Sequence, residues 1–392
     1  MSSRRFLVSF VLLNSVMGLS VGLAKVATPL YALSLGASEA VLAVVAGAQT
    51  AGILLIGLPM GFLVDRYGPA GLFVIGSLCA GAMYAVVPLV PAPMFLVACT
   101  FVISFFMPFR FVTLNTVFLE QLAQLGEDKA GWARGSHMAG TALLGPALAA
   151  LLIERSGYDV TYWLIAALFL VTMLMSPLVF RGHARSEGRG RSLKWSEIRA
   201  QLALMASDVE LRGACLVDFV GQAIMIFYTF FIVVIAVAKL GLSTEQASGL
   251  VTAQGLAYVL ALFALGRVGA RLGDAQVYVA SGLLIGIALV VLGTTASVTL
   301  LWVGGLLLGL GLGLLQIVNL MRFARIGGRL GRGKVAGLNA LVGPGGALAG
   351  SVGGGLLGQQ VGLQRVFLAF LPMIALLCWQ LHVRRAALPV EA

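Results

Sequence analysis

The sequence predicts an all-α integral membrane protein with twelve transmembrane helices in two pseudo-symmetric six-helix bundles. Three observations support this fold class. First, 60% of the residues are hydrophobic and 10% are charged, with a mean hydropathy of +1.01, which excludes a water-soluble domain of this length. Second, long apolar segments recur along the whole chain. Third, a sequence pattern returns after 205 residues, and internal duplication is how many membrane transporters are built.

The apolar segments are each long enough to cross a bilayer, which takes about 17 to 25 residues. We place them at residues 6–31, 39–62, 70–89, 94–117, 135–153, 160–180, 213–237, 245–266, 276–294, 299–321, 335–357 and 365–382. Between them, residues 88–93, 154–159 and 239–243 are expected to be short loops.

The long segment 181–212 is polar and basic, and it separates the two sets of six spans. We therefore predict an N-terminal bundle over residues 1–182, a cytoplasmic linker loop over 183–208 and a C-terminal bundle over 209–392. The chain begins with Arg4-Arg5, as a signal peptide would. However, the apolar run continues for roughly 25 residues without a convincing cleavage site, so we interpret it as a retained first helix.

The basic residues predict the orientation, because positively charged loops stay on the cytoplasmic side. With both termini inside, 21 of the 26 Lys and Arg residues are cytoplasmic, and only Arg155, Lys239 and Arg365 lie outside. This bias predicts a multi-pass protein of the cell inner membrane with cytoplasmic termini. It also explains the net charge of +11 without nucleic acid, although a nucleic-acid-binding patch in 181–199 is the alternative reading.

The repeat is clearest in Gly61-Phe-Leu63-Val-Asp65-Arg66-Tyr-Gly68, which returns in weaker form at residues 266–273. The same register aligns further pairs without gaps, among them Gly36 with Gly241, Ser38 with Ser243, Gln49 with Gln254 and Gly157 with Gly362. A register maintained over such distances indicates a duplicated half.

The segment 61–68, twelve predicted spans and a basic central loop together resemble the major facilitator superfamily, whose signature between helices 2 and 3 is G-x-L-x-D-R-x-G. By this resemblance, Gly61, Asp65, Arg66 and Gly68 form a conformational latch. Asp65 would meet the N-terminal end of helix 11 near residues 334–337, and Arg66 would anchor the contact. An ordinary polar turn is the alternative. Pro69 and Ala70 depart from the signature, since basic residues are usual there, and Ala270 replaces the acid in the second half.

A second resemblance concerns helix 5, where the sequence from Gly140 to Ala150 resembles the Gly-Pro-x-x-Gly-Gly element of drug and proton antiporters. Both terminal glycines of that element are alanine here. Gly145 and Pro146 predict a kink, because proline removes a backbone hydrogen bond, and the small residues permit close packing. The resemblance favours export, while glycine-rich packing common to all such transporters is the alternative. Gly343-Pro344 offers a comparable kink in helix 11.

Charges within spans mark candidate sites, because ionisable groups are costly in the hydrocarbon region. Arg110 lies deep in helix 4, resembles the helix 4 arginine of these antiporters and is expected to line the cavity. Lys25 lies about 9 Å of helical rise from the outer end of helix 1, so snorkelling explains it as well as function does. Asp218 in helix 7 is either a counter-charge or proton carrier, or a salt-bridged end residue.

Polar residues within the spans complete the candidate substrate and proton pathway, although each could instead make an interhelical hydrogen bond. They are Asn14, Asn115, Gln222, Gln316 and Asn319, with Gln49, Tyr228 and Gln254 as further candidates. No Asp or Glu lies deep in the first six spans, whereas two basic residues, Lys25 and Arg110, lie within spans of this half. This distribution favours an anionic or zwitterionic substrate.

The sequence therefore predicts a secondary active transporter of a small organic solute that works by alternating access. We expect a proton-coupled exporter of an anionic or zwitterionic compound, and a proton-driven importer of a ferric siderophore or organic acid is the alternative. No nucleotide-binding loop, metal-spaced cluster or nucleophile triad indicates an enzyme, a metal or a cofactor. The expected partners are the small-molecule substrate, protons and the lipid bilayer, and we expect a monomer.

Overall fold

The computed structural model describes residues 3–125, 130–181, 203, 205, 207–264, 274–330 and 332–377. All regular elements in these ranges are helices, in agreement with the predicted all-α class. Nine of the described helices are long and apolar enough to cross a membrane. One of them, Gly135–Phe180, covers two predicted spans, and Val366–Leu377 is a shorter apolar helix.

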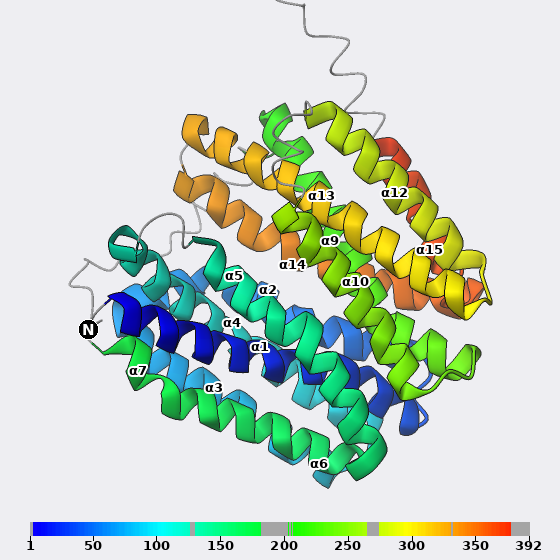
Figure 1. Cartoon of the computed structure of the whole chain (residues 1–392), viewed down its shortest axis with the longest axis horizontal. Helices are drawn as coiled ribbons and strands as arrows, with labels where there is room; N and C mark the ends of the chain where they lie inside the picture. Colours follow the sequence, from blue (N-terminus) through cyan, green and yellow to red (C-terminus); the bar gives the residue numbers. More distant parts are fainter. Residues whose placement is uncertain are drawn as a thin grey trace, which may run out of the picture. The chain divides into compact units, whose positions relative to one another are not determined.

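The first half of the chain forms one compact unit of helices (Figure 1). Its elements are α1 (Ser3–Ser34), α2 (Glu39–Tyr67), α3 (Pro69–Val86), η1 (Val87–Leu89), α4 (Pro93–Leu125), α5 (Ala130–Met138), η3 (Ala139–Leu144), α6 (Gly145–Met175) and α7 (Pro177–Phe180). Helix α6 packs against α1 and α3, and α4 packs against α2 and α3. One apolar cluster of this unit consists of Phe6, Phe10, Leu13, Met17, Phe73, Leu114, Val117, Phe118, Val179 and Phe180.

In the second unit, too, all described regular elements are helices. It contains α9 (Val209–Val234), η4 (Ile235–Lys239), α10 (Thr244–Ala264, from Gly249 onward), α12 (Asp274–Thr294), α13 (Val298–Leu330), α14 (Arg332–Val361) and α15 (Val366–Ala369). Helix α9 packs against both α13 and α14, and α12 packs against α13. The ends of α9, α13 and α14 share a small apolar cluster built on Leu211, Ala214, Cys215, Phe323, Ile326, Val335 and Leu338.

The structure corrects two expectations about helix ends. The predicted loop 154–159 is helical and is interrupted only at Gly157, where φ is 78° and ψ is −179°. Helices α2, α4 and α13 extend beyond the predicted spans, to Tyr67, Leu125 and Leu330. Hydropathy marks where a segment meets lipid, but a helix continues as long as its backbone hydrogen bonds do. Most of the predicted linker 183–208, the repeat segment 266–273 and the end of the last span fall outside the described residues.

The 205-residue repeat is visible in the backbone. Gly36 and Gly241 follow helices α1 and η4 with φ of 74° and 65°, and Gly157 and Gly362 have φ of 78° and 85°. Left-handed values of φ are costly for any residue with a Cβ atom. Two pairs of glycines at equivalent positions therefore adopt the same uncommon backbone conformation, which supports duplication of the helix connections.

Replacing Gly157 by alanine tests the cost of this conformation. Among the described residues, no atom lies within 4 Å of the position that a Cβ would occupy at Gly157 or at Gly71, and of these two glycines only Gly157 has a positive φ. We therefore expect Gly157→Ala to lower the stability of the protein in detergent by about 1 to 3 kcal/mol. Gly71→Ala, in an ordinary helical position of α3, should leave stability unchanged or slightly higher. Equal thermal unfolding midpoints for both variants would contradict the account.

Candidate functional site

The glycine and proline element of the fifth predicted span, residues Gly140 to Ala150, packs directly on α1 through glycines. A Cβ atom added at Gly18 or Gly22 would collide with the backbone of residues His137 to Gly145, and one added at Gly140 or Gly145 would collide with the backbone of α1. Backbones approach this closely only where both surfaces lack side chains. The small residues that the sequence places in this element thus serve a specific contact with α1.

The irregularity next to Pro146 is a π-helix, Ala139–Leu144. The N–H of Gly145 donates to the carbonyl of Gly140, a step of five residues. Pro146 has no N–H to donate to the preceding turn, so the regular α-helical ladder is already interrupted there. Single π turns of this kind widen a helix locally and are frequent at functional sites.

Side chains reinforce the same contact. Thr141 Oγ1 donates to the carbonyl oxygen of Gly18 at 3.1 Å. One turn away, the amide of the predicted pathway residue Asn14 donates from Nδ2 to Ser136 Oγ at 2.8 Å, and Asn14 is only 4% exposed. Asn14 therefore makes the interhelical hydrogen bond that was the alternative to a pathway role.

Arg110 is completely buried in the first unit, and its guanidinium group points to α3 and α6. Its Cζ lies 3.7 Å from the ring centroid of Phe169 and 5.9 Å from that of Phe73. Its Nη2 donates to Thr172 Oγ1 at 2.8 Å, and that hydroxyl in turn donates to the carbonyl of Phe169. The aromatic face and the hydroxyl are the groups that accommodate this charge.

Arg110 remains only partly satisfied, because Nε and Nη1 are buried and have no hydrogen-bond partner among the described residues. Its described contacts include no carboxylate and none of the other predicted site residues. An incompletely paired cation in a membrane-spanning bundle is costly, which makes its presence a functional indication. Sequence reasoning found Arg110 but missed Phe169 and Thr172, which lie about 60 residues away along the chain.

The remaining predicted residues of the first unit are dispersed. Lys25 is half-buried in α1, one turn after Gly22, and Asn115 is exposed on α4. In the latch segment, Gly68 has φ of 80° and forms a one-residue connection between α2 and α3. Gly61 lies within α2, and no described atom lies within 4 Å of the position that its Cβ would occupy.

Of the two charged latch residues, the structure describes the side chain of Arg66 but not that of Asp65. Arg66 is exposed, with its guanidinium 5.4 Å from the ring centroid of Tyr67. The side chain of Asp65 lies outside the described part of the structure, so its contact with the eleventh predicted span, which is α14, stays a prediction. Pro69, the departure from the family signature, occupies the first turn of α3, where its fixed φ suits a helix start.

In the second unit, Asp218 lies on α9 with 6% exposure, against the Gly343-Pro344 segment of α14. The Cβ position of Gly343 is 3.3 Å from Asp218 Oδ2 and 3.7 Å from Gln222 Cγ. The structure thus brings two predicted pathway residues together at the predicted kink. Gln316 is half-buried on α13.

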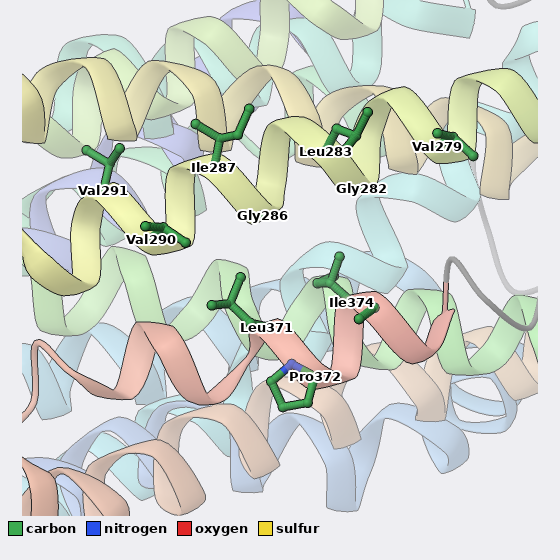
Figure 2. Close-up of a pocket in the computed structure, with 11 residues that line it drawn as sticks. Val279, Gly282, Leu283, Gly286, Ile287, Val290, Val291, Leu371, Pro372 and Ile374 are labelled. Carbon is green, nitrogen blue, oxygen red and sulfur yellow. The ribbon is translucent and has the colours of Figure 1, made fainter.

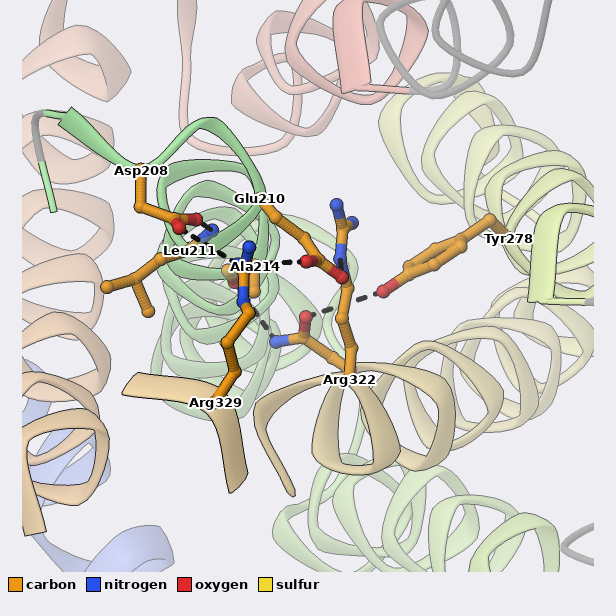
Figure 3. A network of polar contacts seen from close by, with 8 residues as sticks. Asp208, Glu210, Leu211, Ala214, Tyr278, Arg322 and Arg329 are labelled. Carbon is orange, nitrogen blue, oxygen red and sulfur yellow. Dashed lines mark hydrogen bonds and ion pairs between the residues drawn. The ribbon is translucent and has the colours of Figure 1, made fainter. Parts of the chain in front are cut away.

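A seam of polar side chains joins the start of α9 to the end of α13 (Figure 3). Arg329 Nη2 is 2.8 Å from Asp208 Oδ2 and 3.2 Å from Glu210 Oε2, and Arg322 Nε is 3.9 Å from Glu210 Oε1. Asp208 also caps α9, since its Oδ1 accepts from the N–H of Leu211 at 2.8 Å. Sequence reasoning missed this seam, although the acids at the start of α9 and the arginines near the end of α13 were visible in the sequence.

The seam continues inward through Asn319, the last of the predicted pathway residues. Its Nδ2 donates to the carbonyl oxygen of Ala214 at 3.1 Å, and its Oδ1 accepts from the hydroxyl of Tyr278 on α12 at 3.4 Å. Asn319 is 1% exposed. It therefore connects three helices of the second unit.

An apolar groove of about 650 Å³ lies between α12 and the segment after α15 (Figure 2). Its lining side chains are aliphatic or absent, from Val279, Gly282, Leu283, Gly286, Ile287, Val290, Val291, Leu371, Pro372, Ile374 and Ala375. These side chains offer no hydrogen-bond donor or acceptor, and none of the predicted site residues lines the groove. It is not a candidate site for a charged or polar solute.

Comparison with known proteins agrees with this architecture. The family model of the Major Facilitator Superfamily matches residues 10–238 and 214–390. No curated protein sequence matches significantly. Similar solved structures include a mutant form of the nucleoside transporter NupG, with 15% identity, a TM-score of 0.79 and coverage of 96% of this chain and 99% of that chain.

Two further solved structures have the same fold. The human organic anion transporter MFSD10 (TETRAN) is 16% identical with a TM-score of 0.68, and the match covers 97% of this chain and 100% of that chain. A bacterial homolog of the human lysosomal transporter Spinster, inward-facing and unoccupied, is 13% identical with a TM-score of 0.73, covering 97% and 96%. At these identities the likeness establishes the fold only.

The environment of Arg110 generates a prediction about stability. Methionine nearly fills the space of the arginine stem and carries no charge, so Arg110→Met should unfold at the same temperature as the wild type or higher. Arg110→Ala should lose about 2 to 5 kcal/mol because it leaves a cavity. Thermal unfolding of the purified variants in detergent measures both. If Arg110→Met were as unstable as Arg110→Ala, the guanidinium itself would be a net stabilising group.

Proposed function

Because the chain belongs to the Major Facilitator Superfamily, we propose that this transporter is a proton-coupled exporter of a small anionic or zwitterionic organic compound. It works by alternating access in the inner membrane. Members of this family are carriers rather than enzymes, and the chain is a multi-pass membrane transporter. The substrate class, the direction and the coupling ion are the proposal.

The observation that carries the proposal is the division of buried charge between the two units. The spans of the first unit contain Lys25 and the fully buried Arg110, and the sequence has no Asp or Glu deep in those spans. In the second unit, the buried acid Asp218 lies against the Gly343-Pro344 segment of α14. In a medium of low dielectric constant, such charges act over longer distances than in water.

The two cations create a positive potential in the first unit that favours a negatively charged group on the substrate. Because Arg110 faces α3 and α6 and is enclosed by Phe169, Phe73 and Thr172, we assign it an electrostatic role within this unit. Lys25, which is half-buried on α1 near the glycine contact, is the better candidate for direct attraction of the substrate.

Asp218 is the candidate carrier of the coupling proton. A charged carboxyl group inside a membrane-spanning helix is costly, so protonation and deprotonation of such a group are common steps in proton-coupled transport. Its neighbour across the helix contact is Gly343, whose lack of a side chain leaves room for the carboxyl group. Protonation of Asp218 therefore changes the charge at the point where α14 has its proline.

Export is favoured by the glycine and proline element that joins α1, η3 and α6. This element resembles the one found in drug and proton antiporters, and it forms a π-helix packed backbone to backbone on α1. A break in the regular hydrogen-bond ladder is a place where a helix bends at low cost.

Vesicles with a pH gradient provide the test of direction. In everted vesicles that are acidic inside, a proton-coupled exporter accumulates its substrate, whereas a proton-driven importer of a ferric siderophore or organic acid does not. We expect accumulation of one or more candidate carboxylates, phosphorylated compounds or zwitterions. Accumulation only in right-side-out vesicles with an acidic exterior would establish import in place of export.

Variants in the same vesicles test the charges. Asp218→Asn should abolish accumulation driven by the pH gradient and retain exchange of substrate across the membrane, because the site persists without a titrating group. Glu154→Gln, which alters an exposed acid of α6, is the matched control and should transport normally. Full proton-driven accumulation by Asp218→Asn would rule out Asp218 as the proton carrier.

Arg110→Met, which we expect to be folded, should lose transport of an anionic substrate by about tenfold or more, since each 1.4 kcal/mol of lost attraction corresponds to a factor of ten. Arg110→Lys should retain a part, because it keeps the charge and loses the planar stacking on Phe169. Normal transport by Arg110→Met would show that the charge is not required.

A further inference from the structure

The polar seam between α13 and α9 leads from the exposed end of the helices toward Asp218. Asn319, Arg322 and Arg329 are separated by three and seven residues, so they share one face of α13. On α9, Glu210, Ala214 and Asp218 follow each other at intervals of four residues and likewise share a face. Arg322 and Arg329 contact Glu210, and Asn319 contacts Ala214 (Figure 3).

The carbonyl that Asn319 binds belongs to the turn of α9 that carries Asp218. In an α-helix the N–H of each residue donates to the carbonyl four residues earlier, which for Asp218 is the carbonyl of Ala214. Asn319 Nδ2 donates to that same oxygen at 3.1 Å. Asn319 is therefore connected to the backbone of Asp218 through one shared acceptor.

Asn319 is itself held firmly. It is 1% exposed, and Tyr278, at 4% exposure, donates to its Oδ1 at 3.4 Å. A buried amide that loses a partner has no water to replace it, so the cost of breaking either bond is about 1 to 3 kcal/mol. The side chain of Asn319 is thus held between α12 and α9 by two hydrogen bonds.

On its other side, the backbone of α9 is in close contact with the backbone of α14. A Cβ atom added at Gly346 or Gly350 of α14 would collide with the carbonyl oxygens of Phe219 and Ala223. Helix α9 is therefore fixed by hydrogen bonding to α13 on one side and by backbone contact with α14 on the other. Asp218 lies between these two contacts, with its Oδ2 beside Gly343.

We propose that Asn319, held by Tyr278, is a positioning residue for Asp218 that sets the proton affinity of its carboxyl group. This inference rests on the proposed role of Asp218 as the proton carrier. Asn319 is not a proton donor to the substrate and does not exchange protons itself. It acts by fixing the distance between the Asp218 carboxyl group and the Gly343-Pro344 segment of α14.

A spectroscopic titration tests the inference without a known substrate. The infrared carbonyl band of a protonated carboxylic acid is followed against pH in the purified full-length protein, and the part that disappears in Asp218→Asn is assigned to Asp218. We expect Asn319→Leu to shift the midpoint of this band by about one pH unit, a tenfold change in proton affinity. Tyr278→Phe should shift it in the same direction by less, and Asn319→Gln should restore part of the wild-type value.

Ser281→Ala is the matched control. Ser281 Oγ donates to the backbone carbonyl of Tyr278 on α12, so the variant removes a buried hydroxyl on the same helix and leaves the side-chain hydrogen bond between Tyr278 and Asn319 in place. It should leave the midpoint unchanged. A wild-type midpoint in both Asn319→Leu and Tyr278→Phe would overturn the inference. If Asn319→Leu failed to fold, Tyr278→Phe alone would decide between these results.

The two proposals fail separately. Full proton-driven accumulation by Asp218→Asn contradicts the role of Asp218 as the proton carrier, whatever the infrared titration gives. An Asp218 band that does not respond to Asn319→Leu or Tyr278→Phe contradicts the positioning role, even where Asp218→Asn abolishes coupling.

Discussion

The absence of water from the bilayer core is the constraint on which this structure depends. A polar group inside the membrane must find its partner within the protein, and backbone groups find theirs only in helices. Several described side chains meet this requirement, and Arg110 meets it in part. Asn14 bonds to Ser136, Asn319 bonds to Ala214 and Tyr278, and Arg110 uses the hydroxyl of Thr172 and the ring of Phe169.

Close backbone packing answers the same constraint in a second way. Lipid tails are as apolar as leucine, so burial of apolar side chains gives little preference for helix over lipid. Glycines on α1 and η3 in the first unit, and on α14 in the second, allow helices to approach until their backbones touch. Both contacts involve the first helix of a half and the helix that carries a Gly-Pro pair, which agrees with the duplication.

Much of the fold could be predicted because its signals can be read along the sequence without knowing how the helices pack. Apolar length predicted the spans, and the 205-residue register predicted equivalent connections, which Gly36 with Gly241 and Gly157 with Gly362 bear out in their φ angles. Helix ends were less predictable. Helix α13 runs to Leu330, past Gly327 and Gly328, whereas the apolar segment that predicted the span ends at residue 321.

The site was less predictable than the fold. Hydropathy gives the depth of Arg110 in its helix but not the direction in which its side chain points, and its partners Phe169 and Thr172 belong to a distant segment. The ion pairs of Asp208 and Glu210 with Arg329 likewise join residues about 120 positions apart. Such pairings arise from how helices pack, and composition and spacing within one segment contain no information about them.

Solvent exposure decreases along the seam between α9 and α13. The Arg329 side chain is 55% exposed and that of Arg322 is 11% exposed, while Asn319 is 1% exposed. Salt screens charges that are in contact with solvent over about 8 Å at physiological ionic strength, and it barely affects buried hydrogen bonds. The outer members of the seam therefore loosen as ionic strength rises, and the inner members do not. The attachment of α9 to α13 at its solvent-facing end thus depends on the ionic composition of the medium, whereas the turn of α9 around Ala214 is insulated from it.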